Sequence, residues 1–228
     1  MIQPTHFKLP TWEEKSKGEQ VESLKQLVQD LYGYVLSEPM EQIRKTLHNH
    51  QPVDEKESQD VATALSLMNV HANLLNMNCE IGHFTGSALV VNPRKNQFLL
   101  HYHKKLHKWL QFGGHPDFET DLLQVALRET REETGLTDLQ CYPKASSKSP
   151  IDVDIHTIPQ KGDQPEHVHI DFRYVLATNE PEKIEIAEGE SQEMRWFNFD
   201  VLTEVEGIVD QSLLRMIQKV KKLLKQTN

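Results

Sequence analysis

The first third of the chain carries apolar residues at helical spacing, three or four positions apart. They are Val21, Leu24, Leu27, Val28, Leu31 and Val35, and this spacing predicts an amphipathic helix. Pro39 interrupts the pattern and is expected to start a second, shorter helix, because its missing N–H costs nothing in a first turn. After a further break at Pro52, the apolar residues predict a third helix over residues 55–77. We therefore predict a helical N-terminal extension, residues 1–80, ahead of a domain that spans residues 81–228.

Beyond Gly82 the pattern changes to short apolar runs bounded by turn residues, which is typical of β-strands. Strands are expected over residues 87–91, 97–103, 139–145, 151–158, 167–177 and 193–199, and a short apolar segment, 109–112, runs into a pair of glycines. A helix is predicted from about residue 120 to residue 134, where Gly135 ends it as a C-cap, and another over residues 211–224. Strands with a few inserted helices, preceded by a helical segment, indicate an α/β or α+β sandwich.

The acidic composition argues against bulk nucleic acid as a partner. The 228 residues carry a formal net charge of −9, which disfavours binding to a phosphate backbone. The basic residues near the C-terminus are expected on the solvated face of the last helix. They are Arg215, Lys219, Lys221, Lys222 and Lys225.

The cysteines and the N-terminal sequence indicate the cellular compartment of the protein. Cys79 and Cys141 lie far apart and in no metal-ligand spacing, which favours a reducing compartment over a disulfide scaffold. The N-terminus lacks the basic and apolar regions of a signal peptide, and no apolar run is long enough to span a bilayer. We expect a cytoplasmic protein with no membrane partner.

Three glutamates lie in the helix predicted from about residue 120 to residue 134. Glu129, Glu132 and Glu133 lie at offsets of three and four, which puts their side chains on one helical face. Like charges at this spacing destabilise an isolated helix by roughly 0.2–0.5 kcal/mol per pair, so compensation is expected from Arg128, Arg131 and divalent cations. Oxygen-only ligands suit Mg²⁺ or Mn²⁺. A solvated, salt-bridged helix face is the alternative on composition alone.

Residues 114–136 resemble the Nudix box, G-x5-E-x7-R-E-U-x-E-E-x-G-U, in which U is a bulky apolar residue. The positions in register are Gly114, Arg128, Glu129, Glu132, Glu133, Gly135 and Leu136. Two positions depart from the box: Thr120 stands in place of its first glutamate, and Thr130 in place of an apolar residue. Because so many fixed positions at long spacing rarely coincide by chance, the resemblance is specific.

The similarity extends over residues 83–199, which resemble a whole Nudix domain. The segments 108–115 and 166–173 are similar to a bacterial subgroup whose box opens GGHxDG and often lacks the first glutamate. The resemblance implies a Nudix-like three-layer α/β/α sandwich with a mixed sheet. It also implies hydrolysis of the diphosphate in a nucleoside diphosphate linked to another group, with Mg²⁺ or Mn²⁺ as cofactor and a small nucleotide derivative as substrate.

The resemblance carries roles to the acidic residues of the box. Glu129, Glu132 and Glu133 would hold the metal. Arg128 in such boxes usually steadies the first glutamate. With Thr120 at that position, Glu132, four residues after Arg128, is the candidate partner.

The loop ahead of the helix is expected to supply a replacement for the missing glutamate. Glu119 or Asp117 could reach the metal if the loop bends, and Phe118 between them could anchor the loop by packing. Thr120 cannot act as a charged ligand, but it could cap the N-terminus of the helix. We therefore expect a shifted site rather than a broken one.

Hydrolysis of a diphosphate also needs a base. The oxygens of a diphosphate repel an incoming nucleophile, and metal ions neutralise them and lower the pKa of bound water. A nearby carboxylate then takes the proton. We favour a glutamate of the Glu132-Glu133 pair, with Glu190 or Glu193 from a later loop as alternatives.

A histidine-rich strand is the second candidate for chemistry. His167, His169, Asp171 and Arg173 alternate along one predicted strand and therefore share a face, and the subgroup phrase also runs H-x-H-x-D-x-R. We favour a substrate-binding role, in which these residues and His115 meet phosphate or ribose. A zinc or iron site of His167, His169 and an acid is an alternative of lower weight, and satisfied internal hydrogen bonds are another.

The leading hypothesis is a metal-dependent pyrophosphohydrolase. A diphosphate-substrate isomerase on the same fold and a non-catalytic nucleotide-sensing module are the rivals, because a fold does not settle function. The intact glutamates argue against a pure binder, whereas Thr120 argues for one. The N-terminal helices could form a lid, a contact in a homodimer or a support for the sheet.

Overall fold

The structure, a computed structural model, describes residues 16–104, 106–117, 119–143, 149–185 and 193–227. By the closeness of its residues, the chain divides into two compact units, 1–43 and 44–228. The division into an extension of residues 1–80 and a domain of residues 81–228 stays a prediction. Among the helices of the described residues, none is both long enough and apolar enough to cross a membrane.

α1 (Lys17–Asn49) is one continuous helix, so the expectation of a new helix at Pro39 is wrong. At its start, the Glu19 carboxylate accepts from the Ser16 N–H at 2.8 Å, and the Ser16 hydroxyl accepts from the Glu19 N–H at 3.4 Å. This reciprocal pair is a capping box. Pro39 lacks a backbone donor, but its ring holds φ close to the helical value. The helix therefore passes through the proline at the loss of one hydrogen bond.

α2 (Glu55–Val70) begins after Asp54, whose side chain accepts from the Glu57 N–H at 2.8 Å. This is the usual role of an aspartate at an N-cap. The helix is shorter than the predicted range of 55–77, because His71 takes an extended backbone with φ −121° and ψ 115°. The segment that follows is rich in asparagine, which favours turns over helix interiors.

The described residues form one eight-stranded sheet along the path β3-β2-β1-β7-β5, with β4 beside β1, β6 beside β7 and β8 beside β2. β1 and β7 pair in parallel, and the other pairs are antiparallel. The strands are β1 (Gly82–Asn92), β2 (Gln97–His103), β3 (Lys108–Leu110), β4 (Phe112–Gly114), β5 (Gln140–Cys141), β6 (Asp152–Ile158), β7 (His167–Ala177) and β8 (Met194–Asn198). The predicted bounds of β2 and β7 are matched to the residue, whereas β5 is shorter than expected, and residues 144–148 lie outside the described chain.

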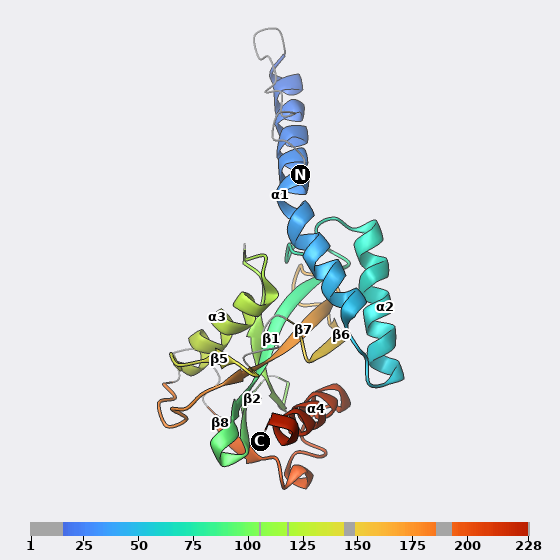
Figure 1. Cartoon of the computed structure of the whole chain (residues 1–228). Coiled ribbons are helices and arrows are strands. Elements are labelled where there is room, and N and C mark those ends of the chain that lie inside the picture. Colours follow the sequence, from blue (N-terminus) through green and yellow to red (C-terminus); the bar gives the residue numbers. More distant parts are fainter. Residues whose placement is uncertain (1–15, 105, 118, 144–148, 186–192, 228) are drawn as a thin grey trace. The chain divides into compact units, whose positions relative to one another are not determined.

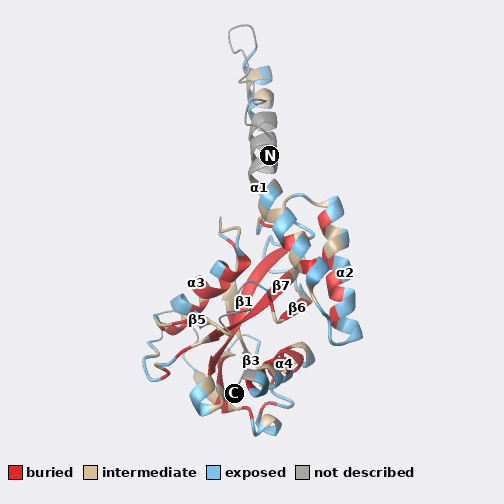
Figure 2. Cartoon of the chain, viewed as in Figure 1, coloured by how far each residue is buried: buried red, intermediate tan, exposed pale blue. Residues whose placement is uncertain are grey.

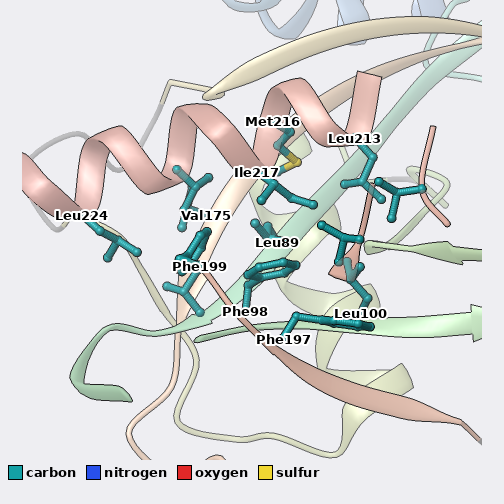
Figure 3. Packing of buried hydrophobic residues seen from close by; sticks show 14 residues of the cluster. Leu89, Phe98, Leu100, Val175, Phe197, Phe199, Leu213, Met216, Ile217 and Leu224 are labelled. Carbon is teal, nitrogen blue, oxygen red and sulfur yellow. The ribbon is translucent and has the colours of Figure 1, made fainter. Parts of the chain in front are cut away.

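The remaining helices are α3 (Leu122–Thr134), α4 (Gln211–Thr227) and two short 3-10 turns, η1 (Pro93–Lys95) and η3 (Leu202–Glu204). α4 covers one face of the sheet and closes the main apolar core (Figure 3). The core joins helix residues Leu213, Met216, Ile217 and Leu224 to strand residues Leu89, Phe98, Leu100, Val175 and Phe197. Figure 2 shows β1 and β7 as a buried centre, and every residue of β1 is buried.

α3 covers the opposite face. A Cβ added to Gly86 of β1 would lie 2.3 Å from the Leu122 carbonyl oxygen, so α3 sits directly on that residue. Since successive side chains of a strand point to opposite faces, Gly86 and the α4-facing Leu89 lie on different sides of the sheet. The result is a helix–sheet–helix sandwich with a mixed sheet, which confirms the predicted fold class (Figure 1).

Candidate active site

The caps of α3 place its acidic residues. The N-cap is Asp121, whose side chain accepts from the Leu123 N–H at 3.0 Å, so the expectation that Thr120 caps this helix is wrong. At the other end Gly135 takes φ +71°, a left-handed conformation that favours glycine, and its N–H donates to the Arg131 carbonyl at 2.8 Å. The helix thus ends where the sequence predicted.

The sheet-facing side of α3 explains one departure from the Nudix box. Leu123, Ala126, Leu127 and Thr130 are buried. The Thr130 hydroxyl donates to the Ala126 carbonyl oxygen at 2.6 Å. A threonine is therefore tolerated at a buried apolar position, because its one polar group is satisfied within the helix.

The glycine pair of β4 lies directly against the acidic side of α3. The Gly113 N–H donates to Glu133 Oε2 at 3.1 Å. A Cβ on Gly114 would fall 2.4 Å from the Glu129 carboxyl carbon, so any other residue there would displace that carboxylate. Strand β4 and helix α3 are therefore fitted to one another through two of the three predicted metal ligands.

Arg128 ties the acidic helix to the preceding loop. Its Nη1 donates to Glu129 Oε1 at 2.8 Å and to Glu132 Oε2 at 3.3 Å, so Glu132 is a partner, as expected, and Glu129 is the nearer one. Its Nη2 donates to the His115 carbonyl oxygen at 2.7 Å and lies 3.8 Å from Asp117 Oδ2. Arg128 thus donates to a backbone carbonyl of the loop, whereas in the Nudix box its expected partner is the first glutamate.

Glu129 and Glu132 differ in how far their carboxylates are exposed to solvent. Burial raises the pKa of Glu129, although the adjacent Arg128 guanidinium opposes the effect. The Glu129 side chain is only 16% exposed, whereas that of Glu132 is 58% exposed. A cation at this face would offset the cost of ionising the buried carboxylate.

The loop that should replace the missing glutamate is partly described. Asp117 has a positive φ of 46°, and the Glu119 N–H donates to the Pro116 carbonyl at 2.7 Å. Glu119 is half-buried, and Phe118 lies outside the described residues. Of the two alternative bases, Glu193 is exposed and Glu190 lies outside the described residues. A shifted ligand at Glu119 or Asp117 stays a prediction.

The predicted histidines gather around one that the sequence did not single out. The rings of His83, His115, His167 and His169 cluster at the start of β1 and β7, with neighbouring centroids 4.7–5.4 Å apart. His83 lies in register with His169 across the parallel pair. His83 lies ahead of the strand predicted over residues 87–91, although it belongs to the observed β1. Which strand pairs with β7 is also not visible in a single sequence.

The surroundings of three of these rings favour the neutral imidazole. Burial, together with the neighbouring His115 and His167, lowers the pKa of His83 to about 4. Burial also lowers the pKa of His115, and the pKa of His169 is lowered by burial and by the surrounding histidines. His167 is fixed in one tautomer, because its Nδ1 lies 2.9 Å from the Pro165 carbonyl oxygen, which can only accept.

Asp171 and Arg173 share the sheet face with these histidines but have protein partners. Asp171 accepts from the hydroxyls of Thr85 and Ser87 at 3.0 and 2.7 Å, and from Arg173 Nε at 3.1 Å. Arg173, only 3% exposed, also contacts Asp152, Asp154 and Ser212. Their assignment to substrate binding stays a prediction, and in this structure they support the sheet face next to the histidines.

The expectation of a solvated basic face on α4 is wrong for two of its members. Arg215 and Lys219 are each 8% exposed. Arg215 donates to both carboxylate oxygens of Asp152, at 2.8 and 2.9 Å, and Lys219 donates to Glu57 of α2. A buried ionic network therefore joins α2, α4, β6 and β7. Lys222 and Lys225 are exposed, as predicted, and Lys221 is half-buried.

Comparison with known proteins gives a family match that covers most of the described sheet. The NUDIX domain family matches residues 83–219. The probable DHNTP pyrophosphohydrolase of Lactococcus lactis subsp. cremoris is 37% identical over 107 residues, which are 46% of this chain and 58% of that protein. The chain thus spans less than two thirds of the length of this relative.

The solved structures similar to this chain include the following two. A NUDIX-family hydrolase from Clostridium perfringens is 23% identical with a TM-score of 0.43, over 64% of this chain and 98% of the other. A binary complex of the Ap4A hydrolase of C. elegans is 18% identical with a TM-score of 0.44, over 63% of this chain and 98% of the other.

Proposed function

Because this chain belongs to the NUDIX domain family, we propose that it is a metal-dependent hydrolase that cleaves the diphosphate of a nucleoside diphosphate linked to another group. The observation that carries the proposal is the fit between the glycine pair of β4 and the acidic side of α3. Glu133 accepts from the Gly113 N–H, and Glu129 fills the space that a side chain at Gly114 would take. This arrangement places two carboxylates of α3 directly against the backbone of β4.

The donor set suits the proposed cofactor. We assign Glu129, Glu132, Glu133 and Glu119 as ligands of Mg²⁺ or Mn²⁺, because they offer only oxygen atoms. Bound there, such an ion would neutralise phosphate oxygens and lower the pKa of a water molecule. The raised pKa of the buried Glu129 fits this assignment, since a nearby cation favours its ionised form.

The chain's own residues then have distinct roles. A glutamate of the Glu132-Glu133 pair takes the proton from the attacking water, whose oxygen bonds to phosphorus. The bond between phosphorus and the bridging oxygen breaks, and the bridging oxygen leaves with its electron pair on the other phosphate. Arg128 positions Glu129 and Glu132 by donating to both, and it holds the loop through the His115 carbonyl. Glu119 is assigned to the place of the missing box glutamate.

The histidine face is the proposed substrate side of the domain. The sequence hypothesis that His115, His167, His169, Asp171 and Arg173 bind phosphate or ribose is retained as a proposal. Because Arg173 is buried and already pairs with three aspartates at 3.1–3.4 Å, we assign Arg173 and Asp171 a positioning role within this set. A cytoplasmic location and a homodimer also stay predictions.

The test is a chromatographic screen for cleavage products, with the full chain and Mg²⁺ or Mn²⁺. Substrates would be nucleotide sugars, dinucleoside polyphosphates, ADP-ribose, nucleoside triphosphates and DHNTP, the last because it appears in the name of the lactococcal relative. We expect turnover of at least one, and its loss in a Glu132→Gln, Glu133→Gln double variant. Glu206→Gln is the matched control, because Glu206 is an exposed acid outside α3.

The outcomes distinguish the proposed hydrolase function from the assignment of its glutamates. No turnover of any substrate with either metal would contradict the hydrolase and favour a nucleotide-sensing module. Unchanged turnover in the double variant would contradict only the assignment of Glu132 and Glu133.

A further inference from the structure

Three histidines from three separate strands or loops point ring nitrogens at one spot. His83 opens β1, His169 lies beside it in β7, and His115 directly follows β4. One ring nitrogen from each lies within 4.8 Å of the corresponding atoms of the other two. The two β-strands are paired in register over ten residue pairs, so two of the three rings are carried on one long parallel strand pair.

We propose that His83, His115 and His169 bind one divalent transition-metal ion of the zinc class, at a site distinct from the acidic side of α3. This goes beyond the proposed hydrolase function, in which the glutamates hold the metal. It also differs from the zinc alternative raised by the sequence, because His83 and His115 take the places of His167 and the acid. For His115 and His169 it revises the substrate contact proposed above, because the nitrogens that would meet substrate bind the ion instead.

The spacing of the nitrogens fits such an ion. Zinc–nitrogen bonds of about 2.0–2.1 Å in a tetrahedral site put neighbouring nitrogens about 3.3–3.4 Å apart. His115 Nε2 and His169 Nε2 are 3.4 Å apart. The longest separation in the set, at most 4.8 Å, closes with a modest rotation of side chains.

The burial of His83 is the independent observation. Its side chain is fully buried, with 0% exposure, and neither ring nitrogen has a hydrogen-bond partner among the described residues. An unsatisfied buried polar atom is costly, and a core position would ordinarily carry an apolar residue instead. A metal–nitrogen bond satisfies one of these atoms and explains why an imidazole stands there.

His167 adds a neighbour of the same kind. Its Nδ1–H donates to the Pro165 carbonyl, which leaves Nε2 as the atom with a lone pair, and Nε2 is buried without a partner among the described residues. A histidine that donates one ring N–H to a backbone carbonyl and offers the other nitrogen is the usual form of a metal ligand. Its ring lies 5.0 Å from that of His83, so His167 is the candidate for a fourth position.

The donor chemistry separates this site from the glutamates. Imidazole suits zinc, copper, nickel and iron, whereas Mg²⁺ and Mn²⁺ are held by oxygen. The two sites therefore select different metals from one mixture. The alternative is a stack of neutral rings in which His115 and His169 share one N–H···N hydrogen bond, and that alternative leaves His83 unsatisfied.

The test measures metal content, without reference to hydrolysis. The untagged full chain is stripped with a chelator, equilibrated with Zn²⁺ or with Co²⁺ as a coloured probe, and desalted. We expect about one ion per chain by mass spectrometry and a visible Co²⁺ spectrum with nitrogen ligation. The Glu132→Gln, Glu133→Gln double variant should retain both, which separates this site from the hydrolase site.

Ligand variants complete the test. His115→Ala changes a half-buried residue outside the strands and should fold, as circular dichroism would verify. It should weaken zinc binding by more than the roughly 10–100-fold that loss of an outer partner costs, and so should His83→Ala. His107→Ala is the control, because His107 is exposed and outside the set.

Two results would overturn the proposal. One is a wild-type chain that retains no Zn²⁺ or Co²⁺ after desalting. The other is zinc retained by His115→Ala and His83→Ala but lost from the glutamate double variant, which would assign the ion to α3.

Discussion

Replacing Glu57 by glutamine should destabilise the domain by about 3 kcal/mol at pH 7. The Glu57 side chain is fully buried and accepts from His50 at 2.7 Å, from the Val53 N–H at 2.9 Å and from Lys219. Burial by itself raises the pKa of this carboxyl, but the hydrogen bonds from His50 and Lys219 outweigh it and lower the pKa to about 2. The native state therefore prefers the ionised carboxylate strongly.

The magnitude follows from that pKa. A fall from the ordinary value of 4.5 to about 2, at about 1.4 kcal/mol per pKa unit, gives about 3 kcal/mol. Breaking buried ion pairs by removing one partner costs about 3–5 kcal/mol, which agrees. Because the folded pKa is the lower one, this stability is fully present above pH 4.5 and is lost as the pH falls towards 2. Roughly half of it should be gone at pH 3.5.

Urea and thermal unfolding, followed by circular dichroism from pH 7 to pH 3.5, would measure the effect. In a domain of this size about 3 kcal/mol lowers Tm by roughly 6–12 °C. Glu55→Gln is the matched control: Glu55 is an exposed acid in the same helical turn, and its loss should cost below about 1 kcal/mol. A Glu57→Gln variant within 1 kcal/mol of wild type at pH 7, or a difference that does not shrink with falling pH, would refute the reasoning.

Two further substitutions probe the helix that carries the acids. Gly114→Ala should lower turnover at least about 10-fold with the fold intact. The added Cβ would meet the Glu129 carboxyl carbon at 2.4 Å, and small displacements in an active site are costly. Steady-state kinetics together with circular dichroism would check this, and full activity would contradict it. Thr130→Val should change stability by less than about 1 kcal/mol, since the Thr130 hydroxyl bonds a carbonyl within its own helix. A larger loss in urea unfolding would show that the hydroxyl has a further role.

Local patterns accounted for much of the fold. The bounds of β2 and β7 follow from apolar runs between turn residues, and the end of α3 follows from Gly135. The acidic face of α3 was visible because helical spacing alone decides which side chains share a face. These features depend on neighbours within a few residues, which is the range that a single sequence displays.

Features that depend on distant partners could not be predicted in this way. Lys219 looks like a solvated lysine until its partner Glu57, 162 residues earlier, is placed beside it, and Arg215 pairs with Asp152, 63 residues away. His83 joins the histidine cluster only through the parallel pairing of β1 with β7. The prediction of a helix break at Pro39 failed for another reason. A proline removes one backbone N–H donor from a helix, and whether the helix ends there depends on the rest of its contacts.

The place of α4 in the chain has a consequence for biosynthesis. Every strand of the sheet precedes α4 in sequence, yet α4 supplies Arg215, Lys219 and one whole side of the apolar core. A ribosome therefore releases a complete set of strands whose broad apolar face is still bare, while Asp152 of β6 lacks Arg215 and Glu57 of α2 lacks Lys219. Since domains fold as units and exposed apolar faces aggregate, a nascent chain that pauses before residue 211 is the form most in need of a chaperone.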